Sequence, residues 1–188
     1  MKQVALLTGN KGKLQEFRHE LASIGVEVSQ LTAEIEEIQA DTLQEVVRHC
    51  LHQADAQRLG DVVLDDSGLF VETLNGFPGV YSAYAQKTLG CEGLLRLLDG
   101  RADRNARFDS CIGASIDGVH IVVTGTIHGT IATAMKGEGG FGFDPVFIPE
   151  EKNITFAQME MGEKNAISHR GRAIRLLLAE LEARGFKS

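Results

Sequence analysis

The order of apolar and polar residues changes character near the middle of the chain. In the first half, short apolar runs typical of buried strands alternate with stretches in which apolar residues recur every three or four positions, as on one face of a helix. A capping box, Thr42-Leu43-Gln44-Glu45, marks the start of the second helix. The predicted elements are strands over residues 4–7, 26–31 and 62–64 and helices over 14–24, 42–60 and 89–98.

The second half favours antiparallel strands. Residues 106–116 alternate with a period of two, and Asp117-Gly118 then supplies a residue pair that is favoured in two-residue hairpin turns. The other predicted elements are strands over 119–126 and 126–133, a glycine-rich loop over 137–142 and a last helix over about 168–184. Crossover units followed by hairpins indicate an α/β protein. We expect a mixed, twisted sheet with flanking helices that form two lobes around a central cleft, within a single domain of residues 1–188.

Composition and charge narrow the class of protein. Hydrophobic residues make up 43% of the 188, which is ordinary for a globular protein, and no apolar run approaches the roughly 20 residues of a membrane span. The net charge of −7 argues against binding to a nucleic acid polymer, which needs a basic surface, but it allows a small phosphorylated ligand. No signal peptide is evident, and Cys50, Cys91 and Cys111 are widely spaced, as reduced thiols are. We therefore expect a cytoplasmic protein.

A short turn, Thr8-Gly9-Asn10-Lys11-Gly12-Lys13, joins the first predicted strand to the first predicted helix. Its glycine spacing fits neither the phosphate loop of nucleotide-driven motors nor a dinucleotide-binding turn. Backbone N–H groups at the helix start, together with Lys11, Lys13 and the Thr8 hydroxyl, could still hold an anion. The residues alone equally fit a solvated turn that carries two lysines.

Two adjacent aspartates, in Asp65-Asp66-Ser67-Gly68, follow the third predicted strand directly. Ligands of α/β proteins bind at the carboxyl ends of strands, and neighbouring strand residues point to opposite faces, so only one aspartate should face a given cleft. Together with Glu34, Glu36 and Glu37, these carboxylates suit Mg²⁺, which prefers oxygen ligands. A solvated acidic turn is the alternative that the residues also allow.

Two segments near the end of the chain combine unusual residues. Gly139-Gly140-Phe141-Gly142-Phe143-Asp144-Pro145 places two aromatic rings in a flexible loop. We expect one ring to enter the core and the other to present a flat face on which a base can stack. The second segment brings Lys164, His169 and Arg170 close together in sequence. A helix break at Ser168, a good N-cap, would place His169 and Arg170 in the first turn of the last helix, where cations need an anionic or acceptor partner.

The other histidines give a weaker signal. His49 and His52 lie three residues apart on the second predicted helix and could share a metal ion, but no further ligand is evident from the sequence. His19, His120 and His128 fit surface or sheet positions. We therefore do not predict a metal site from any of these five histidines.

Four segments occur in a fixed order along the chain: TGNKGK at 8–13, DDSG at 65–68, GFGFDP at 140–145 and EKNAISHRG at 163–171. In this order they resemble the inosine triphosphate pyrophosphatase family, whose members are also called non-canonical purine nucleoside triphosphate pyrophosphatases. The resemblance extends over nearly the full chain, and residues 37–43 look most like archaeal members. It implies hydrolysis of ITP, dITP and XTP to the monophosphate and pyrophosphate, with Mg²⁺ as cofactor and usually a homodimer.

The resemblance also implies roles for single residues. Asp66 matches the catalytic base and a metal ligand of the family, and Glu37 matches a further metal ligand. The residues that match substrate-binding positions are Thr8, Gly9, Asn10, Lys11, Gly12, Lys13, Ser67, Phe141, Gly142, Phe143, Asp144, Lys164, His169 and Arg170. Because Arg170 has only donors, it is expected to donate to the O6 atom of hypoxanthine or xanthine and to disfavour adenine.

One feature departs from the family pattern. Many members carry a phosphate-contacting lysine on the second helix, whereas this chain has no lysine between Lys13 and Lys87, and Arg48 or His49 falls near that place. Two other activities stay open. One is a Maf-like pyrophosphatase that acts on other modified nucleotides, and the other is a nucleotide-binding sensor without turnover, against which the intact DDSG segment argues.

Overall fold

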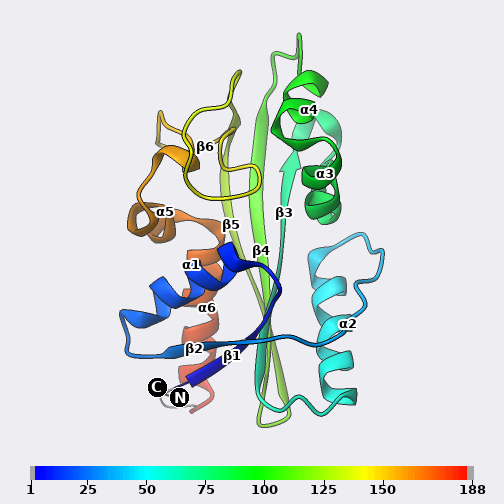
Figure 1. Cartoon of the computed structure of the whole chain (residues 1–188), viewed down its shortest axis with the longest axis vertical. Coiled ribbons are helices and arrows are strands. Elements are labelled where there is room, and N and C mark those ends of the chain that lie inside the picture. Colours follow the sequence, from blue (N-terminus) through cyan, green and yellow to red (C-terminus); the bar gives the residue numbers. More distant parts are fainter. Residues whose placement is uncertain (1–2, 186–188) are drawn as a thin grey trace. The chain divides into compact units, whose positions relative to one another are not determined.

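A computed structural model of the protein describes residues 3–185, and its strands form a six-stranded sheet in the order β2-β1-β3-β4-β5-β6 (Figure 1). The strands are β1 (Gln3–Leu7), β2 (Glu27–Leu31), β3 (Val62–Val71), β4 (Asn105–Ile116), β5 (Val119–Ile131) and β6 (Phe147–Pro149). The helices are α1 (Lys11–Ala22), α2 (Leu43–Ala56), α3 (Ser82–Thr88), α4 (Gly90–Leu97), α5 (Met161–Ile167) and α6 (His169–Ala183). Among the described residues, no helix is long and apolar enough to cross a membrane.

The strand directions confirm the predicted mixed α/β class. β1 runs parallel to both β2 and β3, as expected of crossover units, whereas β5 and β6 are antiparallel. Asp117 and Gly118 form the predicted two-residue turn between the neighbouring strands β4 and β5. Both residues have positive φ, 48° and 74°, which is the backbone conformation that this kind of hairpin turn requires.

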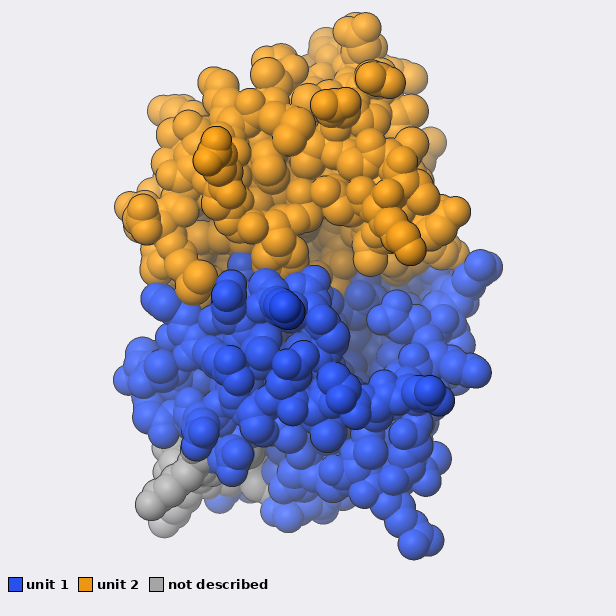
Figure 2. Space-filling view, in the orientation of Figure 1, with its two compact units in different colours: residues 1–66, 110–125, 169–188 blue, residues 67–109, 126–168 orange. Residues whose placement is uncertain are grey.

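The chain divides into two compact units, which Figure 2 shows in different colours. Unit 1 comprises the described parts of residues 1–66, 110–125 and 169–188, and unit 2 comprises residues 67–109 and 126–168. β3, β4 and β5 each contribute residues to both units. Each unit has its own cluster of buried apolar side chains.

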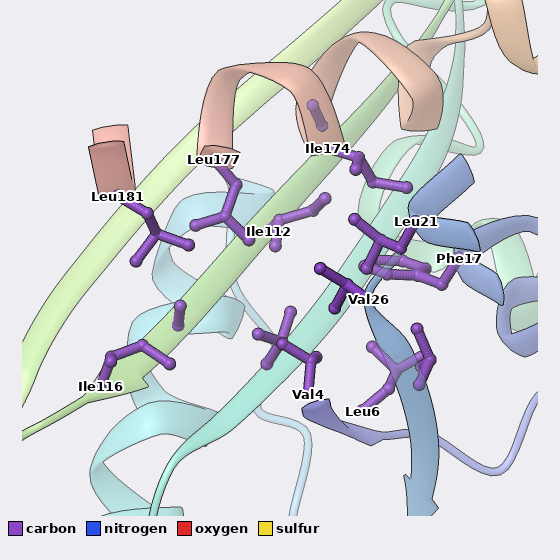
Figure 3. Packing of buried hydrophobic residues seen from close by; sticks show 14 of the residues in the cluster. Val4, Leu6, Phe17, Leu21, Val26, Ile112, Ile116, Ile174, Leu177 and Leu181 are labelled. Carbon is purple, nitrogen blue, oxygen red and sulfur yellow. The ribbon is translucent and has the colours of Figure 1, made fainter. Parts of the chain in front are cut away.

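The core of unit 1 forms where α1 and α6 cover their strands. Phe17 and Leu21 on α1 are buried, as the helical spacing of apolar residues predicts, and they pack in one cluster with Ile174 and Leu177 of α6 (Figure 3). Ile24 is 47% exposed because α1 ends at Ala22, before the predicted end of the helix.

The core of unit 2 is built around three phenylalanine rings. The rings of Phe108 and Phe147 have centroids 4.7 Å apart, and those of Phe147 and Phe156 are 5.2 Å apart. Leu69 and Val71, at the end of β3, are fully buried in the same cluster. Aromatic pairs at such distances add to the stabilisation that their burial gives.

The third predicted strand is longer than expected. β3 does not end before Asp65-Asp66-Ser67-Gly68 but continues through this segment to Val71. Gly68 allows the continuation, because a Cβ atom at this position would lie 2.4 Å from the carbonyl oxygen of Gly79. The aspartates therefore occupy the interior of a strand, and the alternative of a solvated acidic turn is wrong.

Other predicted boundaries need smaller corrections. The two strands predicted over 119–126 and 126–133 are one continuous strand, β5. α2 ends at Ala56 instead of near Gly60, because Arg58 adopts a left-handed conformation with φ of 55°. α3, α5 and β6 were not predicted from the sequence as separate elements.

Candidate active site

The turn after β1 is organised by its own side chains. Oδ1 of Asn10, the N-cap of α1, accepts hydrogen bonds from the backbone N–H groups of Gly12 (2.8 Å) and Lys13 (3.1 Å). The Thr8 hydroxyl oxygen accepts one from the N–H of Asn10 (3.1 Å). Asn10 thus takes the position at the helix start that we expected an anion to occupy. An anion held there by these amides would have to share them with Asn10.

The adjacent aspartates of β3 lie in different surroundings, as expected for successive strand residues. The Asp65 side chain is fully buried, at 0% exposure. Asp66 is half-buried, and both residues border one pocket of unit 1. The two carboxylates therefore have separate tasks, and Asp66 is the better placed to meet a ligand.

Asp65 is the centre of a buried charge network in unit 1. Its Oδ2 accepts hydrogen bonds from Nε (3.3 Å) and Nη2 (3.2 Å) of Arg170, and Nζ of Lys13 lies 3.1 Å away. Its Oδ1 accepts a hydrogen bond from the Ser110 hydroxyl. The buried Glu16 accepts one from Nη1 of Arg170. Two carboxylates and two cations thus balance one another within unit 1.

The network keeps Asp65 ionised. Burial by itself would raise the pKa of Asp65, but Arg170 and Lys13 outweigh this effect and hold the pKa well below its ordinary value of 3.8. Burial likewise opposes the charge of Arg170, whereas Asp65 and Glu16 raise the pKa of its guanidinium above its ordinary value. Both groups are charged at neutral pH.

These contacts involve Lys13 and Arg170, two residues that were predicted to contact the substrate. Nζ of Lys13 also donates to the backbone carbonyl of Asp65 (2.8 Å), and its side chain is 15% exposed. Arg170 is 1% exposed, with both sides of its guanidinium on carboxylates. In this structure both cations form ion pairs with the Asp65 carboxylate. A phosphate contact by Lys13 and a base contact by Arg170 stay predictions, and each would require the present contacts to be shared.

A pocket of about 270 Å³ lies within unit 1 and combines the turn after β1 with the acidic segment and β3. Thr8, Gly9, Glu37 and Asp66 line it, and residues of α2 provide an apolar part of its wall. The structure thus brings four of the predicted site residues to one pocket.

Cys50 on α2 lines the same pocket as Glu37 and Asp66. Burial raises the pKa of the Cys50 thiol to about 11, and the negative charges of Glu37 and Asp66 add to this rise. Glu37 and Asp66 line one pocket, and their carboxylates are the kind of oxygen ligand that Mg²⁺ prefers. The thiol stays protonated at neutral pH and is therefore a poor competing ligand.

Gln53 on α2 and Gln57 at its C-cap hold the acidic segment, a feature that the sequence did not predict. Nε2 of Gln53 donates to the backbone carbonyl of Glu36 (2.7 Å), and Oε1 of Gln53 accepts from the N–H of the same residue (3.0 Å). Nε2 of Gln57 donates to the carbonyl of Glu34 (2.7 Å). Residues 32–41 have no regular secondary structure, so these side chains fix the path of the backbone next to Glu37.

The glycine-rich loop of unit 2 is shaped by Asp144. Oδ2 of this buried carboxylate accepts a hydrogen bond from the N–H of Phe141 (2.8 Å). The same oxygen lies 2.6 Å from Nζ of Lys164. Gly140 has φ of 70°, and a Cβ atom there would lie 2.0 Å from the same carboxylate oxygen, so only glycine fits. Phe143 is 3% exposed and belongs to the core, which confirms that one ring of the loop is buried.

Phe141 and Lys164 form a second contact of this loop. Phe141 is half-buried, and Nζ of Lys164 lies 5.0 Å from the centroid of its ring, within cation–π range. Lys164 is 4% exposed and Asp144 is 3% exposed. Their charges satisfy each other inside unit 2. Phosphate binding by Lys164 and base binding by Asp144 therefore stay predictions, while the contacts show both residues supporting the loop that carries Phe141.

The break between the last two helices lies where it was predicted. α5 ends at Ile167, Ser168 has an extended backbone with ψ of 158°, and α6 begins at His169. His169 and Arg170 are both buried in the first turn of α6. For Arg170, the anionic partners that this position requires are Asp65 and Glu16 of the same unit.

The predicted site residues are distributed over both units. Those in unit 1 are Thr8, Gly9, Asn10, Lys11, Gly12, Lys13, Glu37, Asp66, His169 and Arg170. Those in unit 2 are Ser67, Phe141, Gly142, Phe143, Asp144 and Lys164. The sequence did not predict the roles of Glu16 and Ser110 as partners in the Asp65 network. The only signal for Glu16 was a carboxylate next to the apolar face of α1, which does not identify its partner.

Comparison with known proteins gives concordant matches over most of the chain. The model of the Ham1 family matches residues 4–180. A dITP/XTP pyrophosphatase from Thermococcus kodakarensis is 54% identical over 92% of this chain and 94% of its own length, and one from Pyrococcus horikoshii is 44% identical over 92% and 93%. The solved structure of the Staphylococcus aureus Ham1 protein is 34% identical and covers 97% of this chain and 100% of its own, with a TM-score of 0.82.

Proposed function

Because the chain belongs to the Ham1 family, we propose that it hydrolyses non-canonical purine nucleoside triphosphates (dITP, XTP and ITP) to the nucleoside monophosphate and pyrophosphate. Curated relatives that carry the name dITP/XTP pyrophosphatase support this proposal. The observation in the structure that carries it is the pocket of unit 1, in which Asp66 and Glu37 lie together with the turn after β1.

The chemistry assigned to this pocket is attack by water on phosphorus. Asp66 orients the water and takes its proton, a new bond forms between the water oxygen and phosphorus, and the anhydride bond between the two products breaks. Mg²⁺ held by Glu37 and Asp66 would supply charge neutralisation on the phosphate oxygens and lower the pKa of bound water. Asp65, through Lys13, positions the strand and the turn that border the pocket.

The first test is pyrophosphate release from ITP, XTP, dITP, GTP, ATP and dUTP, each measured with Mg²⁺ and with EDTA. Metal-dependent release that favours ITP, XTP and dITP is the expected result. Release mainly from dUTP or another pyrimidine nucleotide would instead support the Maf-like alternative. Tight binding of ITP without pyrophosphate release would support a sensor and overturn the enzymatic proposal.

Three further properties belong to the same proposal and rest on the family resemblance. They are the Mg²⁺ requirement, a homodimer and a cytoplasmic location. Light scattering on the purified chain tests the homodimer, because the mass of one chain is 20.4 kDa and a dimer doubles it. A monomer at working concentration would remove this part of the proposal without affecting the assigned reaction.

A further inference from the structure

A second cluster of metal-ligating side chains lies in unit 1, away from the residues that line the candidate active site. His52 and Asp55 stand three residues apart on α2, and His120 lies on β5. One ligand atom from each of these residues lies within 4.8 Å of the other two. His52 and Asp55 are exposed and His120 is partly exposed, so solvent reaches the cluster. None of the three lines the pocket that holds Asp66.

The cluster is already ordered by contacts among its members. Nε2 of His120 lies 2.6 Å from Oδ2 of Asp55, and the rings of His52 and His120 have centroids 5.4 Å apart with 61° between their planes. The buried Ser115 donates from its hydroxyl to Oδ1 of Asp55 (3.0 Å). Because Ser115 bonds to the carboxylate and not to an imidazole, this arrangement is not a serine nucleophile with its base.

We propose that His52, Asp55 and His120 bind a divalent transition metal ion such as Zn²⁺. Two imidazole nitrogens and one carboxylate oxygen are a common donor set for zinc, whereas Mg²⁺ takes oxygen ligands. Metal–ligand bonds of about 2.0–2.2 Å require the three donors to draw closer together, and exposed side chains at a helix end and on a strand can do so by rotation. Three protein ligands leave a coordination position for water.

Ser115 has a supporting role in this site. Carboxylates that ligate a metal are usually oriented by a hydrogen bond to their other oxygen, which Ser115 supplies to Asp55. The bound ion would link α2 to the hairpin of β4 and β5, because His120 is the second residue of β5. The site is independent of the proposed hydrolysis, since it shares no residue with that pocket.

The test is isothermal titration of the full chain with Zn²⁺ after treatment with EDTA and its removal, in the presence of millimolar Mg²⁺. We expect one equivalent of Zn²⁺ to bind. His52→Ala and His120→Ala should each weaken binding at least tenfold, and Ser115→Ala about tenfold, in line with the loss of an orienting group. His49→Ala, on the same helix, and His128→Ala, on the same strand, are the matched controls and should leave the affinity unchanged.

A spectroscopic measurement separates loss of metal binding from loss of folding in the variants. Co²⁺ in place of Zn²⁺ should give visible absorption bands that disappear in the His52→Ala/His120→Ala double variant, while circular dichroism confirms that this variant is folded. Absence of Zn²⁺ binding to the wild-type chain would overturn the proposal. So would Zn²⁺ binding that persists in the double variant, or that is lost in Glu37→Gln instead, because the ion would then belong to another site.

Discussion

Asp65 and Asp66 are neighbours in the chain, but they have different physical tasks. Both border the pocket in which Glu37 also lies, but the Asp65 carboxylate is fully buried on Arg170, Lys13 and Ser110, whereas Asp66 is half-buried. Replacing each aspartate by asparagine changes little in volume and removes the same charge. The two variants therefore separate a role in folding from a role in the reaction.

Asp66→Asn should retain the fold and lose most of the turnover. The amide cannot take a proton from water and is a weaker metal ligand, so we expect kcat for pyrophosphate release to fall by about 10²–10⁴. The free energy of unfolding should change by no more than about 1 kcal/mol, since the residue is half-buried. Near-normal kcat at saturating Mg²⁺ and substrate would refute the role assigned to Asp66.

Asp65→Asn should act on stability first. The change removes one carboxylate partner of the buried Arg170, and removing one member of a buried ion pair typically costs about 3–5 kcal/mol. Urea unfolding of the two asparagine variants side by side measures the difference. If Asp65→Asn unfolds at the same urea concentration as Asp66→Asn, the network does not hold unit 1 together.

At the scale of elements, the irregular segment after β2 depends on α2. Glu37 lies in a stretch without regular secondary structure, and the side chains of Gln53 and Gln57 bond to its backbone. The apolar face of α2 points into unit 1, with Val47 and Leu51 at 0% exposure. Gln53 on α2 and Gln57 at its C-cap therefore hold the segment that carries Glu37, the proposed metal ligand.

The double variant Gln53→Ala/Gln57→Ala should loosen this ligand without unfolding the chain. Each lost hydrogen bond is worth about 0.5–1.5 kcal/mol, so the Mg²⁺ concentration for half-maximal pyrophosphate release should rise by about 3–10-fold. Gln44→Ala is the matched control, because Gln44 lies on the same helix but donates to Thr124 (2.8 Å). An equal Mg²⁺ requirement in both variants would contradict the role of the two glutamines.

Periodicity was sufficient to predict most elements. Apolar spacing located α1, α2, α6 and the parallel strands, because these elements bury one face or both in a core. It failed at β3, where Asp65-Asp66-Ser67-Gly68 has the composition of a turn but the backbone stays extended. Tertiary packing of Leu69 and Val71 decides this case, and local composition does not contain that information.

The residues of the candidate site were easier to predict than their partners. The motifs pointed to Asp66, Glu37 and Arg170, and the structure places all three in unit 1. The pairing of Arg170 with Glu16 and Asp65 could not be predicted, because it joins segments that are 154 and 105 residues apart. Such long-range contacts decide whether a cation pairs with a buried carboxylate or is available to bind a ligand.

At the scale of the whole molecule, the buried network makes stability depend on acid pH. The folded-state pKa of Asp65 lies well below the ordinary 3.8, so the unfolded chain binds this proton more readily than the folded chain. The contribution of Asp65 to stability is therefore complete above about pH 5 and is lost as the pH falls through and below 4.

Free energies of unfolding measured in urea at pH 7, 5, 4 and 3 should show this loss. We expect a steep decline below pH 4 for the wild-type chain and a shallower one for Asp65→Asn, which has no carboxylate to protonate at this position. Asp66→Asn serves as the control and should follow the wild type. Parallel curves for all three chains would show that other carboxylates dominate the acid response.

The division into two units also sets an order of events during synthesis. Unit 1 draws on segments from both ends of the chain, and Ile174 and Leu177 of α6 pack in the same cluster as Phe17 and Leu21 of α1. At about 5–20 residues per second, a ribosome needs roughly 7–30 s to pass from α1 to α6. Throughout that interval the apolar face of α1 lacks its final covering, so the nascent chain exposes a surface on which chaperones act.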